Sequence, residues 1–115
     1  AMSLAFDLRK RYLVMVENNG AVEHLPSDAM VEIPAYITDR GPEPVRVGEI
    51  PTFYKGLIEQ QEAVEKLIVD AAVEHSYEKA LMAFTLSKTV PSLLVAKKIL
   101  DDMIVANKAY WPELH

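Results

Sequence analysis

The sequence contains no cysteine, and this absence excludes disulfides, thiolate metal sites and a cysteine nucleophile. It has only four glycines, whose spacing fits neither G-x-G-x-x-G nor a P-loop: Gly20, Gly41, Gly48 and Gly56. No apolar run approaches the roughly 18 residues that span a bilayer, and no apolar signal core is present near the N-terminus. We therefore expect a cytoplasmic protein that does not contact membranes.

Basic residues are few as well. The chain has 12 lysines and arginines against 17 acidic residues, a net charge of −5, and its densest basic group is the triplet at residues 9–11. Nucleic-acid binding depends on a basic patch, so no nucleic-acid partner is expected. Half of the 115 residues are apolar and a quarter are charged, as in ordinary globular proteins. This length predicts one domain, residues 2–115.

Helical periodicity dominates the second half of the chain. Residues 51–74 carry apolar side chains at spacings of three, four and seven, at Leu57, Ile58, Val64, Leu67, Ile68, Ala71 and Ala72. This pattern predicts a helix with one buried face. Ser76 is a natural N-cap for a second helix over 77–86, and a third is predicted from about Pro91 to Asn107.

The first half has strand and turn signals. Residues 12–16 predict a strand that ends in a turn at Asn18-Asn19-Gly20, and residues 30–38 predict a second strand, in which Pro34 favours an edge position or a bend. A loop is expected over 39–44 and a short strand over 45–47, paired with 31–38 as a hairpin. Residues 3–11 fit a strand or a short helix capped by Ser3. The predicted fold class is α+β, a small antiparallel sheet followed by three helices.

Side chains with catalytic or metal-binding chemistry are scattered. None of the three histidines, His24, His75 and His115, lies within helical reach of another, so we expect all three to be surface residues. The carboxylates that an acid/base pair would need alternate with lysines as on a solvated helix face: Glu59, Glu62, Glu65, Asp70, Asp101 and Asp102. Four aromatic residues are expected to anchor helix ends against the core: Tyr54, Tyr77, Tyr110 and Trp111. The residues themselves define no self-contained active site.

The order of short motifs resembles the C-terminal part of family 4 glycoside hydrolases, in the 6-phospho-α-glucosidase (maltose-6-phosphate glucosidase) branch. The motifs cover nearly the whole chain from Tyr12, at residues 16–22, 25–28, 31–36, 41–48, 50–51, 55–61, 77–81, 89–92 and 106–112. The resemblance implies hydrolysis of 6-phosphorylated O-glycosides with NAD and Mn²⁺, an exception to two-carboxylate hydrolysis. It also implies a Rossmann domain followed by a C-terminal domain like that of lactate and malate dehydrogenases, of which this chain is the later part.

The resemblance also implies that the family's nucleotide fingerprint, metal ligands, tyrosine base and phosphate-binding arginine precede the residues present here. No catalytic, cofactor-binding or metal-binding residue is therefore assigned to this chain, and none of these ligands is expected to bind it alone. Asn18, Asn19 and Gly20 are the candidates for a loop near the substrate.

We expect an inactive, structural part of a 6-phospho-α-glucosidase that forms homo-oligomers by covering an exposed stripe through Leu57, Val64 and Leu67. Whether this chain is itself to be counted as an enzyme is left open. The alternative is a stand-alone, non-enzymatic protein-interaction domain derived from the same family. Weak binding of a sugar phosphate is disfavoured by the net charge of −5.

Overall fold

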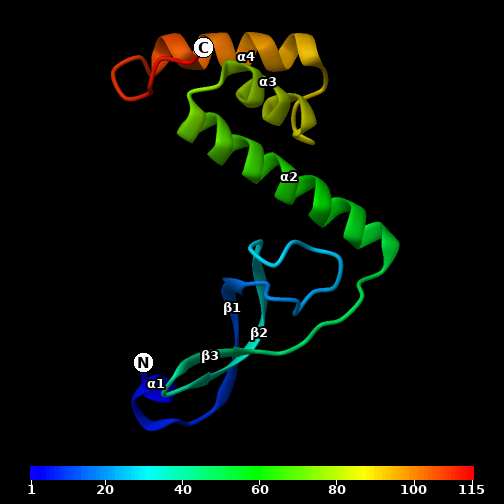
Figure 1. The fold of residues 1–115 in the computed structure, drawn as a ribbon, viewed down its shortest axis with the longest axis vertical. Coiled ribbons are helices and arrows are strands. Elements are labelled where there is room, and N and C mark those ends of the chain that lie inside the picture. The colour runs from blue at the N-terminus through cyan, green and yellow to red at the C-terminus, as the bar shows by residue number, and fades with distance from the viewer. The chain divides into compact units, whose positions relative to one another are not determined.

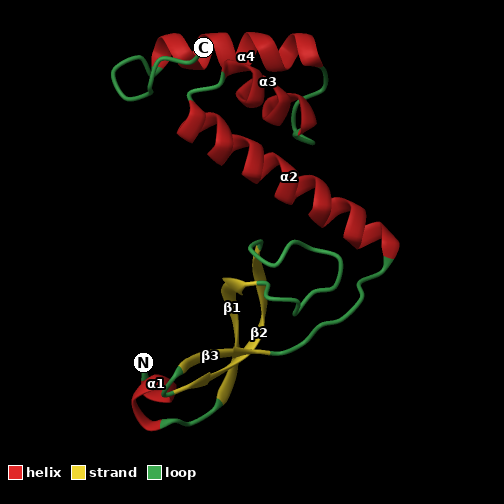
Figure 2. Ribbon diagram, in the orientation of Figure 1, coloured by secondary structure: helices red, strands yellow, loops and turns green.

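A computed structural model describes all 115 residues, which form two compact units, Ala1–Lys55 and Gly56–His115. Figure 1 shows the elements in chain order and Figure 2 shows their type. The elements are α1 (Met2–Phe6), β1 (Lys10–Glu17), β2 (Met30–Thr38), β3 (Gly41–Pro44), α2 (Thr52–Glu74), α3 (Tyr77–Leu86) and α4 (Leu93–Ala106). The predicted α+β class, an antiparallel sheet followed by three helices, is confirmed. The single domain over residues 2–115 stays a prediction.

The opening segment, which the sequence left open between strand and helix, forms α1. Ser3 lies inside this helix and does not cap it. The helix ends at Asp7, whose backbone turns into the left-handed conformation with φ 45° and donates its N–H to the Ser3 carbonyl. β1 then begins at Lys10, two residues earlier than the predicted strand.

One face of the sheet carries the core of the first unit. The strands are antiparallel in the order β1-β2-β3, and the pairs Val14↔Ile33 and Val16↔Val31 place four apolar side chains on one face. Loop residues pack against them: Ala21, Val22, Leu25 and Ile50. The other face leaves large apolar side chains exposed at Leu13, Met15, Met30 and Tyr36. The first unit therefore has one covered and one open sheet face.

The position of the third strand corrects the prediction. Residues 41–44, expected in a loop, form β3 and pair with residues 35–38, whereas residues 45–47 form no strand. The N–H of Val45 donates to the Pro34 carbonyl at 2.8 Å. Because backbone groups point to alternate sides along a strand, the N–H and C=O groups of Glu43 and Gly41 also point toward β2. The nitrogens of Pro42 and Pro44 therefore face away from the sheet. An edge strand tolerates proline at such positions, because no ladder donor is lost.

Pro34 lies in β2, the middle strand, so the expectation of an edge position there is wrong. The nitrogen and the carbonyl of one strand residue point to the same side of the strand. The Pro34 carbonyl accepts the N–H of Val45, so the Pro34 nitrogen also points toward Val45, which lies just beyond the end of β3 at Pro44. The ladder between β1 and β2 loses no donor at this residue. Proline is accommodated because this side of the middle strand is locally an edge.

The helices of the second half follow their capping residues closely. α2 begins one residue after Pro51, whose carbonyl accepts the N–H of Lys55 at 3.0 Å. Ser76 caps α3 as predicted, since its side chain accepts the N–H of Lys79. α4 begins two residues later than predicted because Ser92 is its N-cap and accepts the N–H of Val95. No helix is both long enough and apolar enough to cross a membrane.

The second unit has its own core, formed by Ala71, Ala80 and Leu100. Partly buried side chains complete it, at Tyr77, Leu81, Phe84, Ile104, Trp111 and Leu114. The expected exposure of the stripe on α2 is only partly correct: Leu57 is exposed, but Leu67 is half-buried and Val64 is buried. Val64 and Ala71 are two turns apart, so they share the covered face of the helix.

Candidate functional site

The loop that joins β1 to β2 is built around the side chain of Asn18, which is only 1% exposed. Its Nδ2 donates to the carbonyls of Val22 at 3.1 Å, Leu25 at 3.1 Å and Pro26 at 3.0 Å. Its Oδ1 accepts the N–H of Val22 at 2.7 Å. Both ends of the amide are therefore engaged within the loop, and the side chain of Asn18 acts as its internal support.

The predicted turn at Asn18-Asn19-Gly20 is confirmed. Asn19 and Gly20 both have left-handed backbones, with φ 43° and 81°, and Ala21 donates its N–H to the Asn18 carbonyl at 2.7 Å. Positive φ at both central residues defines a type I′ turn, which asparagine and glycine favour. The Asn19 N–H also donates to the Ser27 carbonyl at 2.9 Å. The proximity of this loop to a substrate stays a prediction.

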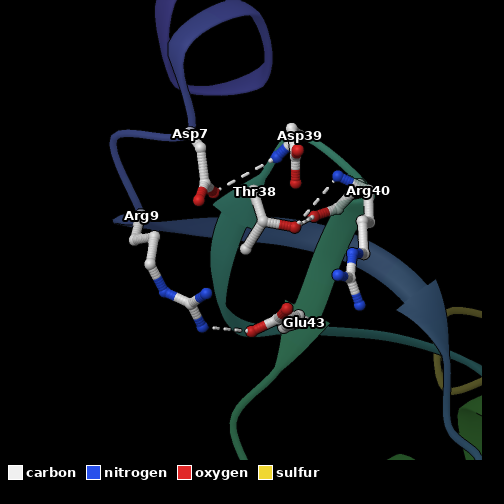
Figure 3. A network of polar contacts seen from close by, with 7 residues as sticks. Asp7, Arg9, Thr38, Asp39, Arg40 and Glu43 are labelled. Carbon is white, nitrogen blue, oxygen red and sulfur yellow. Dashed lines mark hydrogen bonds and ion pairs between the residues drawn. The ribbon is translucent and has the colours of Figure 1, made fainter.

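A second polar group joins the segment after α1 to the sheet (Figure 3). Arg9 and Glu43 form an exposed ion pair, with Nη2 and Oε2 at 2.7 Å. Asp7 accepts the backbone N–H of Asp39 on its Oδ1 at 3.3 Å. Exposed pairs of this kind contribute little to stability, so their main effect is to fix the position of the N-terminal segment.

Thr38 closes the turn between β2 and β3 in the same group (Figure 3). Its buried hydroxyl donates to the Gly41 carbonyl at 3.0 Å and accepts the N–H of Arg40 at 3.2 Å. Gly41 has φ 110°, a conformation that side chains strongly disfavour. This hydroxyl is satisfied by the turn itself, so it is not free for chemistry.

In the second unit, Tyr77, Lys97 and Asp101 connect α3 with α4. The Tyr77 hydroxyl donates to Asp101 Oδ1 at 2.7 Å, and Lys97 Nζ donates to Asp101 Oδ2 at 2.7 Å and to the Tyr77 oxygen at 3.2 Å. The hydrogen bond from Lys97 lowers the pKa of Asp101, and the same bond raises the pKa of Lys97. The group holds two helices together, and it is exposed at Lys97.

These pKa shifts predict how the stability of the second unit depends on pH. Because the pKa of Asp101 is lowered on folding, its contribution is present above the unfolded aspartate pKa of about 3.9 and is lost as pH falls through the folded value. Asp101→Asn is therefore expected to be less stable than the unchanged chain at neutral pH, with the difference disappearing in acid. Urea unfolding followed by Trp111 fluorescence measures this difference.

The matched control is Asp102→Asn, because Asp102 is an exposed aspartate on the same helix. Added salt should reduce the effect of Asp101→Asn at neutral pH, since an exposed ion pair is screened. A difference that keeps its full size at the lowest pH would contradict the ion-pair explanation.

The other candidate residues lie apart. All three histidines are exposed, as expected. The six candidate carboxylates on the helices are half-buried or exposed, and among them Asp70 pairs with Lys79 and Asp101 with Lys97. No group of three or more histidine, cysteine, aspartate or glutamate side chains could hold a metal ion. The chain brings none of these candidates together into a catalytic group.

The expected role of the aromatic residues holds for two of the four. Tyr77 and Trp111 pack against the core of the second unit. Tyr54 and Tyr110 are exposed, so the prediction is wrong for them. Tyr54 contacts the ring of Phe53 edge to face, with the two centroids 5.4 Å apart, so its ring packs on a neighbour within the first turn of α2.

Sequence reasoning missed two groups. For Asn18 the sequence predicts a turn and a place in a loop near the substrate, but nothing in the sequence shows that three carbonyls converge on its amide. The contact of Tyr77 with α4 was also missed, although Lys97 and Asp101 stand four residues apart, the spacing of a helical ion pair.

Comparison with known proteins identifies the family. Residues 1–90 match the family described as "Family 4 glycosyl hydrolase C-terminal domain". Because this match covers most of the chain, the protein belongs to the family 4 glycosyl hydrolases and corresponds to their C-terminal domain. The resemblance noted in the sequence is thereby confirmed.

The similar proteins include phosphoglucosidases. The chain is 56% identical over 114 residues to maltose-6'-phosphate glucosidase of Fusobacterium mortiferum, covering 99% of this chain and 26% of that protein. It is 72% identical, with a TM-score of 0.93, to a 6-phospho-alpha-glucosidase from gut microorganisms solved with NAD and glucose-6-phosphate. A second such enzyme, solved with NAD and Mn²⁺, is 47% identical with a TM-score of 0.93.

Each of these two matches covers 98% of this chain and 26% of the solved chain. The chain thus spans about a quarter of the relatives that it matches. The residues present fit neither NAD nor Mn²⁺ by themselves, because no metal-binding group and no glycine-rich phosphate loop occurs among them.

Proposed function

We propose that this chain is the C-terminal part of an NAD- and Mn²⁺-dependent 6-phospho-α-glucosidase, which hydrolyses 6-phosphorylated O-glycosides in cytoplasmic carbohydrate metabolism. One observation supports this most strongly: almost the whole chain matches one quarter of enzymes solved with NAD, glucose-6-phosphate and Mn²⁺. The 72% identity and the TM-score of 0.93 favour conservation of the local fold and its role.

We propose further that the chain alone is inactive and has a structural role. Its conspicuous polar groups, around Asn18, Thr38 and Tyr77, are occupied in holding its own elements together. NAD and Mn²⁺ are then held by other parts of such an enzyme, and the substrate is a 6-phosphoglucoside.

Homo-oligomer formation is part of the proposal. Large apolar side chains are exposed on α2 at Phe53, Val69 and Val73, and on the open sheet face at Leu13 and Met15. Exposed apolar surface on this scale favours contact with another polypeptide. A second copy and the remainder of a family 4 chain are both suitable partners for it.

The test is hydrolysis of a chromogenic 6-phospho-α-glucoside with NAD⁺, Mn²⁺ and a reductant. We expect no turnover by the 115-residue chain alone. Addition of the remaining three quarters of the 72% identical enzyme, expressed separately, is expected to give turnover, because this chain then completes the fold. Light scattering on the same samples measures assembly.

The control is the same mixture without the 115-residue chain. Turnover by this chain alone would contradict its structural role. A mixture in which the two parts neither associate nor react would contradict its assignment as an interchangeable C-terminal part.

A further inference from the structure

The turn that follows β1 places an asparagine directly before a glycine on the surface of the first unit. We propose that Asn19 is a site of spontaneous deamidation, at which the asparagine is converted to aspartate and isoaspartate. This inference is independent of the proposed enzyme activity, because it uses only the turn and water.

The chemistry needs no group beyond the dipeptide. The backbone nitrogen of Gly20 attacks Cγ of Asn19 and gives up its proton, a C–N bond forms, the bond from Cγ to Nδ2 breaks, and ammonia leaves. Water then opens the cyclic imide at either of its two carbonyls. Opening at one carbonyl gives aspartate, and opening at the other gives isoaspartate, so one water is consumed for each ammonia released.

The surroundings of Asn19 favour this attack. Both Asn19 and Gly20 are exposed, and beyond Gly20 and its two chain neighbours no atom lies within 4 Å of the position that a Cβ of Gly20 would occupy. The main-chain hydrogen bonds of the turn are donated by Asn19 and Ala21, which leaves the Gly20 nitrogen outside them. The Asn19 side chain is held only by one long hydrogen bond, from Nδ2 to Glu17 Oε2 at 3.3 Å.

Ring closure requires the backbone of Asn19 to leave its left-handed conformation. An exposed turn held by two main-chain hydrogen bonds opens locally at low free-energy cost compared with the sheet core. The attacking nitrogen belongs to a residue without a side chain, so nothing obstructs its approach once the turn opens. The exposure of Asn19 and the glycine that follows it therefore both favour deamidation at this residue.

The other two asparagines of the chain are natural controls. Asn18 is 1% exposed, its amide makes four hydrogen bonds, and the next nitrogen belongs to a residue with a side chain. Asn107 is half-buried, donates to the Met103 carbonyl at 2.9 Å and precedes Lys108. Burial and hydrogen bonding hold both amides away from the geometry of ring closure.

Deamidation alters the turn in two ways. A carboxylate replaces the amide that donated to Glu17, so two negative groups stand where a hydrogen bond was. Isoaspartate also adds a methylene group to the main chain between Asn18 and Ala21. These two residues are joined by the hydrogen bond of the turn, from the Ala21 N–H to the Asn18 carbonyl at 2.7 Å. The loop around Asn18 is therefore expected to loosen, with faster hydrogen exchange at the amides of Asn19 and Ala21.

The experiment is storage of the purified chain at neutral and at mildly alkaline pH, followed by peptide mapping with mass spectrometry. Fragment ions separate Asn18 from Asn19, and isoaspartyl methyltransferase labels isoaspartate. We expect Asn19 to react at least about tenfold faster than Asn18 or Asn107, a difference of about 1.4 kcal/mol in activation free energy. The rate should rise with pH, because the Gly20 nitrogen attacks after losing its proton.

Asn19→Gln is the matched variant, because it keeps a side-chain amide but disfavours the five-membered ring. It should show no comparable conversion at residue 19 over the same period, and circular dichroism confirms its fold. Equal rates at Asn18 and Asn19 in the folded chain would overturn the proposal. An unreacted Asn19 after Asn107 has converted would overturn it as well.

Discussion

Asn18→Ala is expected to destabilise the first unit by about 3 kcal/mol. The amide of Asn18 makes four hydrogen bonds inside the loop, and the side chain is almost completely buried. Alanine leaves the carbonyls of Val22, Leu25 and Pro26 without this donor, and water cannot replace it easily at a buried position. Because Val22 belongs to the core cluster of the sheet, loosening of the loop extends to that core.

Hydrogen exchange measured by mass spectrometry on peptides from β1, β2 and their connecting loop reports on this unit directly. The matched control is Asn19→Ala, which removes one exposed hydrogen bond and places alanine in a left-handed conformation, at a cost of about 1 kcal/mol. A loss of protection that is equal in the two variants would show that the buried amide of Asn18 has no special role. Asn18→Asp is expected to be destabilised too, since a carboxylate cannot donate to the three carbonyls.

Leu100→Ala is expected to destabilise the second unit by about 3 kcal/mol or more. Leu100 is 1% exposed and forms the core with Ala71 and Ala80, two residues too small to fill the space that its side chain leaves. It also borders an apolar cavity of about 270 Å³. The substitution therefore enlarges an existing cavity, and the cost of a core truncation rises with the cavity volume that remains.

Trp111 provides the measurement, because it is the only tryptophan of the chain and packs against the same core. Urea unfolding followed by its fluorescence should give a lower midpoint for Leu100→Ala. Leu94→Ala is the control on the same helix, since Leu94 is 81% exposed, and its effect should stay within about 0.5 kcal/mol. Similar midpoints for the two variants would contradict the assignment of Leu100 to the core.

The helices could be predicted closely because their signals are local. Ser76 and Ser92 each accept a backbone N–H three residues ahead, and that bond requires nothing from the rest of the chain. The third strand could not be predicted, because proline at Pro42 and Pro44 argues against a strand unless both nitrogens face away from the sheet. That orientation depends on register, which is set by the pairing partner.

Less of the candidate site could be predicted from the sequence. The turn was predictable, since an Asn-Gly pair favours positive φ wherever it occurs. The burial of Asn18 beside the exposed Asn19 was not, because the two adjacent residues have the same side chain and differ only in the contacts that the folded loop provides. Their different environments arise from the carbonyls of residues 22, 25 and 26.

The division into two units has a consequence for synthesis. All residues of the first unit precede Gly56, so this unit can fold on the ribosome while the later helices are still being translated. The second unit must wait longer, because its core includes Trp111 and Leu114 and because the His115 backbone bonds with His75 and Tyr77 at 2.8 and 2.9 Å. Its nascent helices therefore complete their packing only after residue 115 is available.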